Sequence, residues 1–124
     1  MKRILIVEDD DLSGELMREA LSGRELEVMV VKTGAEALEL AQRERYHLIV
    51  TDIRLPDSNG IELARRIRFH GCSTSSAIFA VSGMPLEDEE VRIFNELFTK
   101  PVSLAHFRDR VLRWLQPSNK EDRP

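Results

Sequence analysis

Five short apolar runs recur along the chain, and segments with helical periodicity separate them. The runs occupy residues 4–7, 28–31, 48–50, 77–81 and 97–99, and they are rich in Val, Ile and Leu. Apolar residues follow one another in each run, which is typical of strands buried on both faces. Strands that alternate with helices favour a parallel sheet covered by helices on both sides. The sequence therefore predicts a doubly wound α/β fold.

Four of the segments between and after these runs show clear helical spacing. The apolar residues are Leu12, Leu16, Ala20 and Leu21 in the first, Ala35, Leu38 and Ala41 in the second, Ile61, Ala64 and Ile67 in the third, and Leu104, Phe107, Val111 and Leu115 in the last. Ser103 is expected to cap the last helix. The fourth connection contains Pro85 and four consecutive acidic residues, so we expect only a short helix there, over residues 87–94.

Length and charge narrow the class of protein further. A chain of 124 residues predicts one domain, which we place at residues 1–117, followed by a polar tail at 118–124. Its net charge of −4 and the lack of a basic block argue against direct nucleic-acid binding. No apolar run reaches the roughly 18 residues that a membrane span needs, and the first is too short for a secretion signal. We expect no membrane insertion and a cytoplasmic location.

Polar side chains follow four of the predicted strands, at the point where each strand ends. Glu8 and Asp9 follow the first, Asp52 the third, Ser82 the fourth and Lys100 the fifth. In parallel α/β sheets, ligands bind beyond the carboxyl ends of the strands. These five residues are therefore expected to meet at one edge of the sheet.

The chemistry of this set suggests phosphoryl transfer to a carboxylate. Carboxylates that converge on one crevice repel one another unless a cation neutralises them, and an open all-oxygen site suits Mg²⁺. Lys100 and Ser82 could contact phosphoryl oxygens, and a carboxylate can act as a covalent nucleophile. Asp52 follows the strand expected at the centre of the sheet, so it is the best-placed acceptor.

The chain resembles the receiver domains of two-component response regulators from residue 2 to about residue 116. Four motifs, in order, carry the resemblance: Ile4-Leu5-Ile6-Val7-Glu8-Asp9-Asp10, Leu48-Ile49-Val50-Thr51-Asp52-Ile53-Arg54-Leu55-Pro56 with Gly60, Ala80-Val81-Ser82-Gly83, and Thr99-Lys100-Pro101. The resemblance implies a flavodoxin-like (βα)5 fold with a parallel sheet in the order 2-1-3-4-5, here with a shortened fourth helix.

It also implies a role for each motif residue. Glu8, Asp9, Asp52 and the backbone carbonyl of Arg54 would hold Mg²⁺, and Asp52 would be the phosphoacceptor. Ser82 matches the switch hydroxyl and Lys100 the phosphate-pairing lysine, with a cis bond before Pro101. The implied partners are a histidine kinase or phosphotransfer protein, and a downstream protein target or an output domain outside this chain.

Two features depart from the family pattern. The aromatic switch position, three residues before the lysine, holds Leu97, and its neighbour Phe98 is expected to point to the opposite face. The connection between Ser82 and Lys100 is about one helical turn shorter than is common, and Ile93-Phe94 replaces the usual Gly-Ala pair. These differences concern signal output and leave the phosphorylation chemistry intact.

Three functions remain open from the sequence. The first is a phosphorylation-driven switch that reacts only with itself and is not an enzyme acting on outside substrates. The second is a degenerate receiver that binds partners constitutively, suggested by Leu97 and the short fourth connection. The third is a Mg²⁺-dependent phosphohydrolase with an Asp nucleophile. Such enzymes need a second acid two residues after the nucleophile, and this chain has Arg54 at that position.

Overall fold

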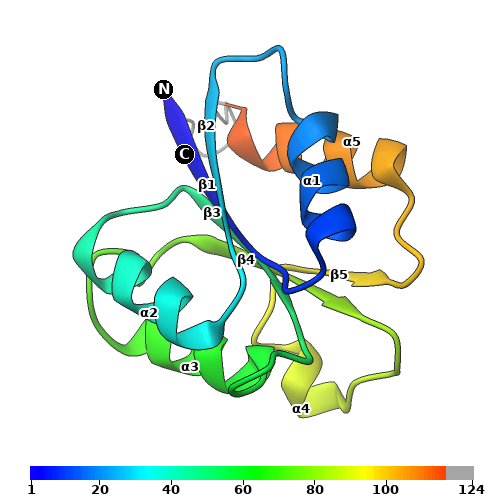
Figure 1. Cartoon of the computed structure of the whole chain (residues 1–124). Helices are drawn as coiled ribbons and strands as arrows, with labels where there is room; N and C mark the ends of the chain where they lie inside the picture. The colour runs from blue at the N-terminus through cyan, green and yellow to red at the C-terminus, as the bar shows by residue number, and fades with distance from the viewer. Residues whose placement is uncertain (117–124) are drawn as a thin grey trace, which may run out of the picture.

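The computed structural model describes residues 1–116, in which five parallel strands alternate with five helices (Figure 1). The strands are β1 (Lys2–Val7), β2 (Leu26–Val31), β3 (Leu48–Asp52), β4 (Ala77–Ser82) and β5 (Glu96–Thr99). The helices are α1 (Asp11–Ala20), α2 (Gly34–Arg43), α3 (Gly60–Phe69), α4 (Asp88–Val91) and α5 (Leu104–Leu115). The sheet order β2-β1-β3-β4-β5 confirms the predicted fold. The predicted tail, residues 118–124, lies outside the described residues.

The sheet separates two apolar cores, and β1 contributes alternate residues to each. Ile4 and Ile6 pack on one face with residues of α1 and α5, whereas Leu5 and Val7 pack on the other with residues of α2 and α3. Figure 1 shows the two pairs of helices on opposite sides of the sheet. This double burial explains why β1 appears in the sequence as an unbroken apolar run.

Two predicted helix faces were partly wrong. At α1, the predicted Leu21 is buried just after the helix end, but Leu12 and Leu16 are exposed, Leu12 at 67%, and Met17 enters the core instead. In α2 the predicted Ala41 and Leu38 do pack on the core, but the predicted Ala35 is exposed and Ala37 is buried in its place. Alanine occurs on both the buried and the exposed face of α2, so residue type alone did not identify the buried face.

Contacts made at the end of the fourth connection limit the length of α4. Only Asp88–Val91 is helical, although the sequence predicted residues 87–94. Phe94 is buried in the core on the α3 side, and the next N–H, of Asn95, donates to the Ile78 carbonyl oxygen at 2.8 Å. The chain must leave the helix to make these contacts.

Within residues 1–116, no helix is long and apolar enough to cross a membrane.

The edge strand β2 also differs from its prediction. The sequence indicated a strand buried on both faces, but its side chains alternate, and Met29 is 44% exposed. β2 pairs only with β1, so one of its long sides has no neighbouring strand. Position in the sheet, rather than composition, sets this exposure.

Gly60 is the first residue of α3 and lies against the backbone of the β3 end. An added Cβ would stand 2.3 Å from the Asp52 carbonyl oxygen, too close for two nonbonded atoms. We therefore expect Gly60→Ala to lower the free energy of unfolding by about 1–3 kcal/mol, because α3 must move away from β3. Chemical denaturation measures this change. Gly83→Ala is the control, since a Cβ there meets no atom within 4 Å; an equal loss in both variants would contradict the steric explanation.

Candidate functional site

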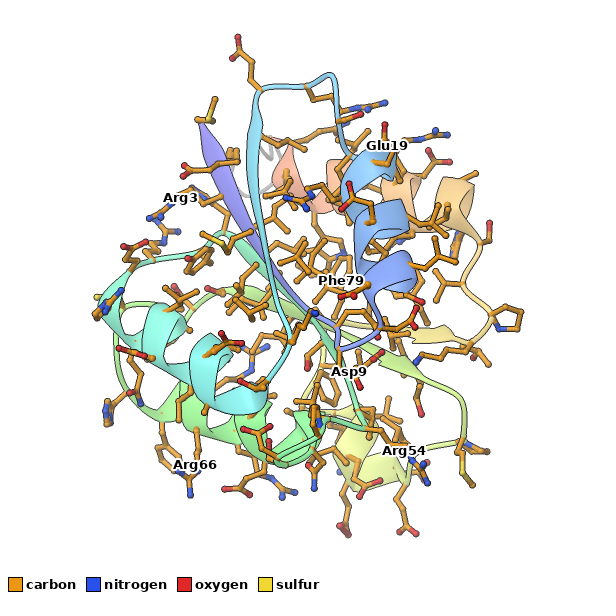
Figure 2. All side chains as sticks on the ribbon, in the orientation of Figure 1. Arg3, Asp9, Glu19, Arg54, Arg66 and Phe79 are labelled. Atoms are coloured by element: carbon orange, nitrogen blue, oxygen red, sulfur yellow. The ribbon has the colours of Figure 1, made fainter. Side chains whose placement is uncertain are left out.

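The five predicted side chains stand at the carboxyl edge of the sheet, as expected. Glu8 and Asp9 directly follow β1, Asp52 and Ser82 are the last residues of β3 and β4, and Lys100 follows β5. The order of the sheet places β3 between β1 and β4, which makes Asp52 central. In Figure 2, Asp9 and Arg54 lie toward this end of the molecule and Arg3 toward the other.

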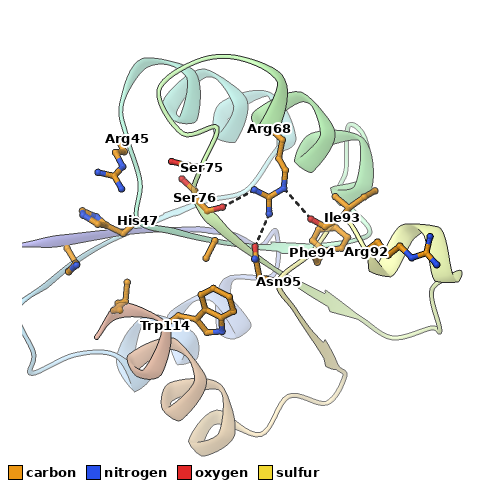
Figure 3. Close-up of a pocket in the computed structure, with 13 residues that line it drawn as sticks. Arg45, His47, Arg68, Ser75, Ser76, Arg92, Ile93, Phe94, Asn95 and Trp114 are labelled. Atoms are coloured by element: carbon orange, nitrogen blue, oxygen red, sulfur yellow. Dashed lines mark hydrogen bonds between the residues drawn. The ribbon is translucent and has the colours of Figure 1, made fainter. Parts of the chain in front are cut away.

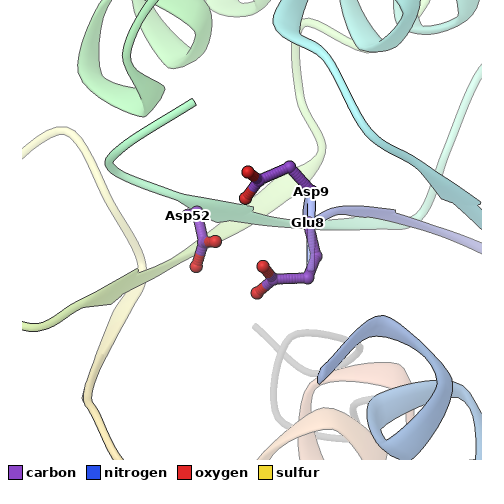
Figure 4. Close-up of side chains that lie close together, drawn as sticks. All are labelled: Glu8, Asp9 and Asp52. Atoms are coloured by element: carbon purple, nitrogen blue, oxygen red, sulfur yellow. The ribbon is translucent and has the colours of Figure 1, made fainter. Parts of the chain in front are cut away.

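Three carboxylates converge at the centre of this edge. Glu8, Asp9 and Asp52 each offer an oxygen, and these atoms all lie within 4.8 Å of one another (Figure 4). Glu8 and Asp52 are almost fully buried, at 2% and 3% exposure, while Asp9 faces solvent. The site is thus a buried acidic pair with one exposed acid at its opening.

Burial perturbs the ionisation of the two buried acids. Burial first, and then the nearby Asp52 carboxyl group, raise the pKa of Glu8 to about 7. Burial also raises the pKa of Asp52, against the opposing effects of Glu8 and then Lys100. The two groups titrate as a pair, because ionising one makes ionising the other harder.

Lys100 partly neutralises this acidic pair. Its Nζ lies 3.3 Å from Oδ1 of Asp52, and its side chain remains 45% exposed. The same Oδ1 is buried and accepts no hydrogen bond from residues 1–116. A buried carboxylate oxygen without a hydrogen-bond donor is costly, so the site favours an added cation or electrophile.

The donor set fits a magnesium ion. Two buried carboxylates and one exposed carboxylate offer oxygen ligands, and Mg²⁺ binds to proteins through a few such carboxylates while it keeps several of its waters. The unpartnered Oδ1 of Asp52 and the raised pKa of Glu8 both indicate negative charge that the surrounding protein does not fully compensate.

Ser82 lies at the carboxyl edge of the sheet, but within residues 1–116 its hydroxyl forms no hydrogen bond with the three acids. Its hydroxyl donates to the Met84 carbonyl oxygen at 2.6 Å and accepts the Met84 N–H at 3.1 Å. The side chain is buried, at the start of the loop that leads to α4. To donate to a phosphoryl oxygen, as predicted, this hydroxyl would have to leave the Met84 carbonyl oxygen.

The remaining predicted features concern the loops. Arg54 is exposed and forms an isolated antiparallel β-bridge with Asn59. The role of its backbone carbonyl as a metal ligand stays a prediction. The Lys100–Pro101 bond is cis, which confirms the expectation. Phe98 is buried among Phe79 and Phe107, while Leu97 is partly exposed, so the two do point to opposite faces.

One residue of the site region had a role that the sequence did not reveal. Asp57, in the loop after β3, accepts the N–H groups of Gly34 and Ala35, both at 2.9 Å. These are the first two residues of α2, and their hydrogen bonds lower the pKa of Asp57. Asp57 therefore ties the loop that carries Arg54 to the start of α2. The partners are more than 20 residues apart, so no local pattern signals the contact.

Comparison with known protein families matches residues 4–111 to the response regulator receiver domain. The chain belongs to this family. Among its relatives, the polar-differentiation response regulator DivK of Brucella anthropi is 29% identical over 118 residues, which cover 92% of this chain and 96% of DivK. The receiver domain is thus a module of two-component signalling, and the match extends over nearly the whole of each chain.

Two solved receiver domains show the same fold. The non-phosphorylated receiver domain of HemR from Leptospira biflexa is 31% identical, with a TM-score of 0.83, and the match covers 95% of this chain and 97% of that one. The receiver domain of a sensor histidine kinase from Pseudomonas aeruginosa is 27% identical, with a TM-score of 0.80, over 91% of this chain and 96% of that one. That structure has a magnesium ion coordinated in the active-site cleft.

Proposed function

We propose that this receiver domain is a phosphorylation-dependent switch that accepts a phosphoryl group on Asp52. The observation that carries the proposal is the position of Asp52. Its buried Oδ1 accepts no hydrogen bond from residues 1–116 and lies 3.3 Å from the Lys100 ammonium, and its carboxylate lies within 4.8 Å of two further acids. The donor would be a phosphohistidine of a histidine kinase or phosphotransfer protein in the cytoplasm, and the phosphorylated form would act on a downstream protein or an output domain.

In the proposed reaction, a carboxylate oxygen of Asp52 attacks the phosphorus. A phosphorus–oxygen bond forms, the phosphorus–nitrogen bond breaks, and the imidazole leaves with the electron pair. Lys100 can pair with a phosphoryl oxygen once Asp52 has become an acyl phosphate, because its ammonium already lies beside that carboxylate. Bound at Glu8, Asp9 and Asp52, Mg²⁺ would neutralise charge on the phosphoryl oxygens.

Asp52 is proposed to be both the nucleophile and the only substrate, so the protein is not an enzyme toward outside molecules. Incubation with acetyl phosphate and Mg²⁺ should add one phosphoryl group, and peptide mapping should place it on Asp52. An acyl phosphate on Asp10 or Asp57 would overturn the assignment. Turnover of a generic phosphate ester would instead indicate the phosphohydrolase alternative, and a lack of labelling would favour a degenerate receiver.

The signal is expected to leave the site through the connection that contains α4. To donate to a phosphoryl oxygen, the Ser82 hydroxyl must give up its hydrogen bond to the Met84 carbonyl oxygen, which would loosen the turn that begins this connection. Leu97 has neither a ring nor a hydroxyl to follow that movement. We therefore expect beryllofluoride with Mg²⁺ to alter hydrogen exchange mainly in residues 83–94, with little change at Leu97. Changes confined to α1 and α2 would contradict this route.

A further inference from the structure

A cavity lies at the amino-terminal edge of the sheet, opposite the edge that carries the acidic site (Figure 3). Its volume is about 470 Å³, which is in the range of small-molecule sites. Residues at the starts of β1 and β4, before β3 and β5, and at the end of α5 line it. The six residues of β1 separate this cavity from the acidic site by about 20 Å. It is therefore distinct from the phosphoacceptor site.

The cavity is strongly basic in a protein whose net charge is −4. Lys2, Arg45, Arg68 and Arg92 line it, and no Asp or Glu is among the described lining residues. Eight other cations in residues 1–116 form ion pairs with carboxylates, but none of these four has a carboxylate within 4.0 Å in that range. Positive charge is thus gathered here without a counter-ion.

Arg68 forms the fixed part of this charge. Its guanidinium donates to the carbonyl oxygens of Ser76 and Ile93 and to Oδ1 of Asn95, at 3.0, 3.3 and 2.8 Å (Figure 3). All three acceptors are neutral, and burial lowers the pKa of Arg68. A partly buried cation held only by neutral groups has an uncompensated charge, which an anion would stabilise.

The pKa of His47, which precedes β3, is also affected by the positive charges that line the cavity. Burial, followed by Lys2 and Arg45, lowers the pKa of His47, so the neutral ring is favoured. Nδ1 accepts the backbone N–H of Arg3 at 3.0 Å, which leaves Nε2 as the protonated nitrogen. The imidazole is therefore available as a neutral hydrogen-bond donor beside two cations.

Trp114 provides an aromatic wall for the cavity. Its indole is 42% exposed, its Nε1–H donates to Glu96 at 2.9 Å, and its ring packs edge-on against Phe79. These two contacts hold the ring in place from the core side. A fixed, partly exposed indole next to unpaired cations suits a ligand that has both a planar ring and an anionic group.

We propose that this cavity binds a nucleotide-like phosphate ester, with its phosphates against Lys2, Arg45 and Arg68 and its ring on Trp114. Arg68 supplies a charge that is already positioned, whereas Lys2 and Arg45 close on the phosphates from the rim. The proposal is independent of phosphorylation at Asp52, because it uses no residue of that site.

Fluorescence offers a direct test, because Trp114 is the single tryptophan of the chain. The full chain is titrated with ADP, adenosine and pyrophosphate in EDTA, so that no metal can bring a phosphate to the acidic site. We expect ADP to quench the emission saturably with a Kd of about 1 mM or tighter. Pyrophosphate should compete with ADP without quenching, and adenosine should bind at least about tenfold more weakly than ADP.

Charge variants identify the binding surface. The double variant Lys2→Gln, Arg45→Gln should weaken ADP binding by about tenfold or more, since both side chains are proposed to contact phosphates directly. Arg65→Gln is the matched control: it removes an exposed arginine of α3 that lies outside the described cavity lining. Absence of saturable quenching, equal binding of ADP and adenosine, or unchanged affinity in the double variant would each overturn the proposal.

Discussion

Replacing Asp52 by asparagine is expected to abolish phosphorylation by acetyl phosphate, with a loss in rate of at least about a thousandfold. The amide keeps the shape of the side chain but lacks the nucleophilic carboxylate oxygen. Asp52 is also the one acid of residues 1–116 that lies within 4.0 Å of the Lys100 ammonium. Rates are measured by intact mass at matched times in the presence of Mg²⁺.

Asp109→Asn is the control for this variant. It removes an exposed carboxylate of α5 and leaves the acidic cluster intact. We expect it to be phosphorylated at close to the parent rate. Asp52→Asn should also fold, because removing one of two neighbouring buried acids relieves repulsion. Substantial labelling of a folded Asp52→Asn protein would show that Asp52 is not the acceptor.

The second large effect is a fall in metal-free stability as the pH rises. Burial raises the pKa of Glu8 from 4.5 to about 7, so between these values the folded protein binds more protons than the unfolded chain. The protonated Glu8 carboxyl therefore makes its full contribution to the free energy of unfolding below pH 4.5, and this contribution is lost as the pH rises through about 7. We expect the free energy of unfolding in EDTA to decrease by roughly 3 kcal/mol between pH 5 and pH 8.

Two comparisons attribute this effect to the acidic pair. At pH 8, Mg²⁺ should restore stability to the parent, because it binds the folded site and not the unfolded chain. Glu8→Gln should make the protein less sensitive to pH, more stable than the parent in EDTA at pH 8, and less responsive to Mg²⁺. Glu19→Gln, an exposed position on α1, should behave as the parent does. A pH-independent unfolding curve for the parent in EDTA would contradict the raised pKa of Glu8.

The local sequence determined the fold class and the position of the site. Unbroken apolar runs such as residues 4–7 require burial on both faces, and that burial selects a parallel sheet between two helical layers. Because parallel strands end at one edge, residues that follow strands meet there, as Glu8, Asp52 and Lys100 do. Each of these inferences depends on only a few neighbouring residues.

Only the tertiary structure decided what depends on contacts between distant segments. Leu12 looks like a core residue but is exposed, whereas Met17, which the helical spacing did not single out, packs in the core. The raised pKa of Glu8 comes from burial beside Asp52, which lies more than 40 positions away. The basic cavity likewise unites Lys2, Arg45 and Arg68 from separate elements. Burial and electrostatic potential are sums over the surroundings in space, so no segment of sequence contains them.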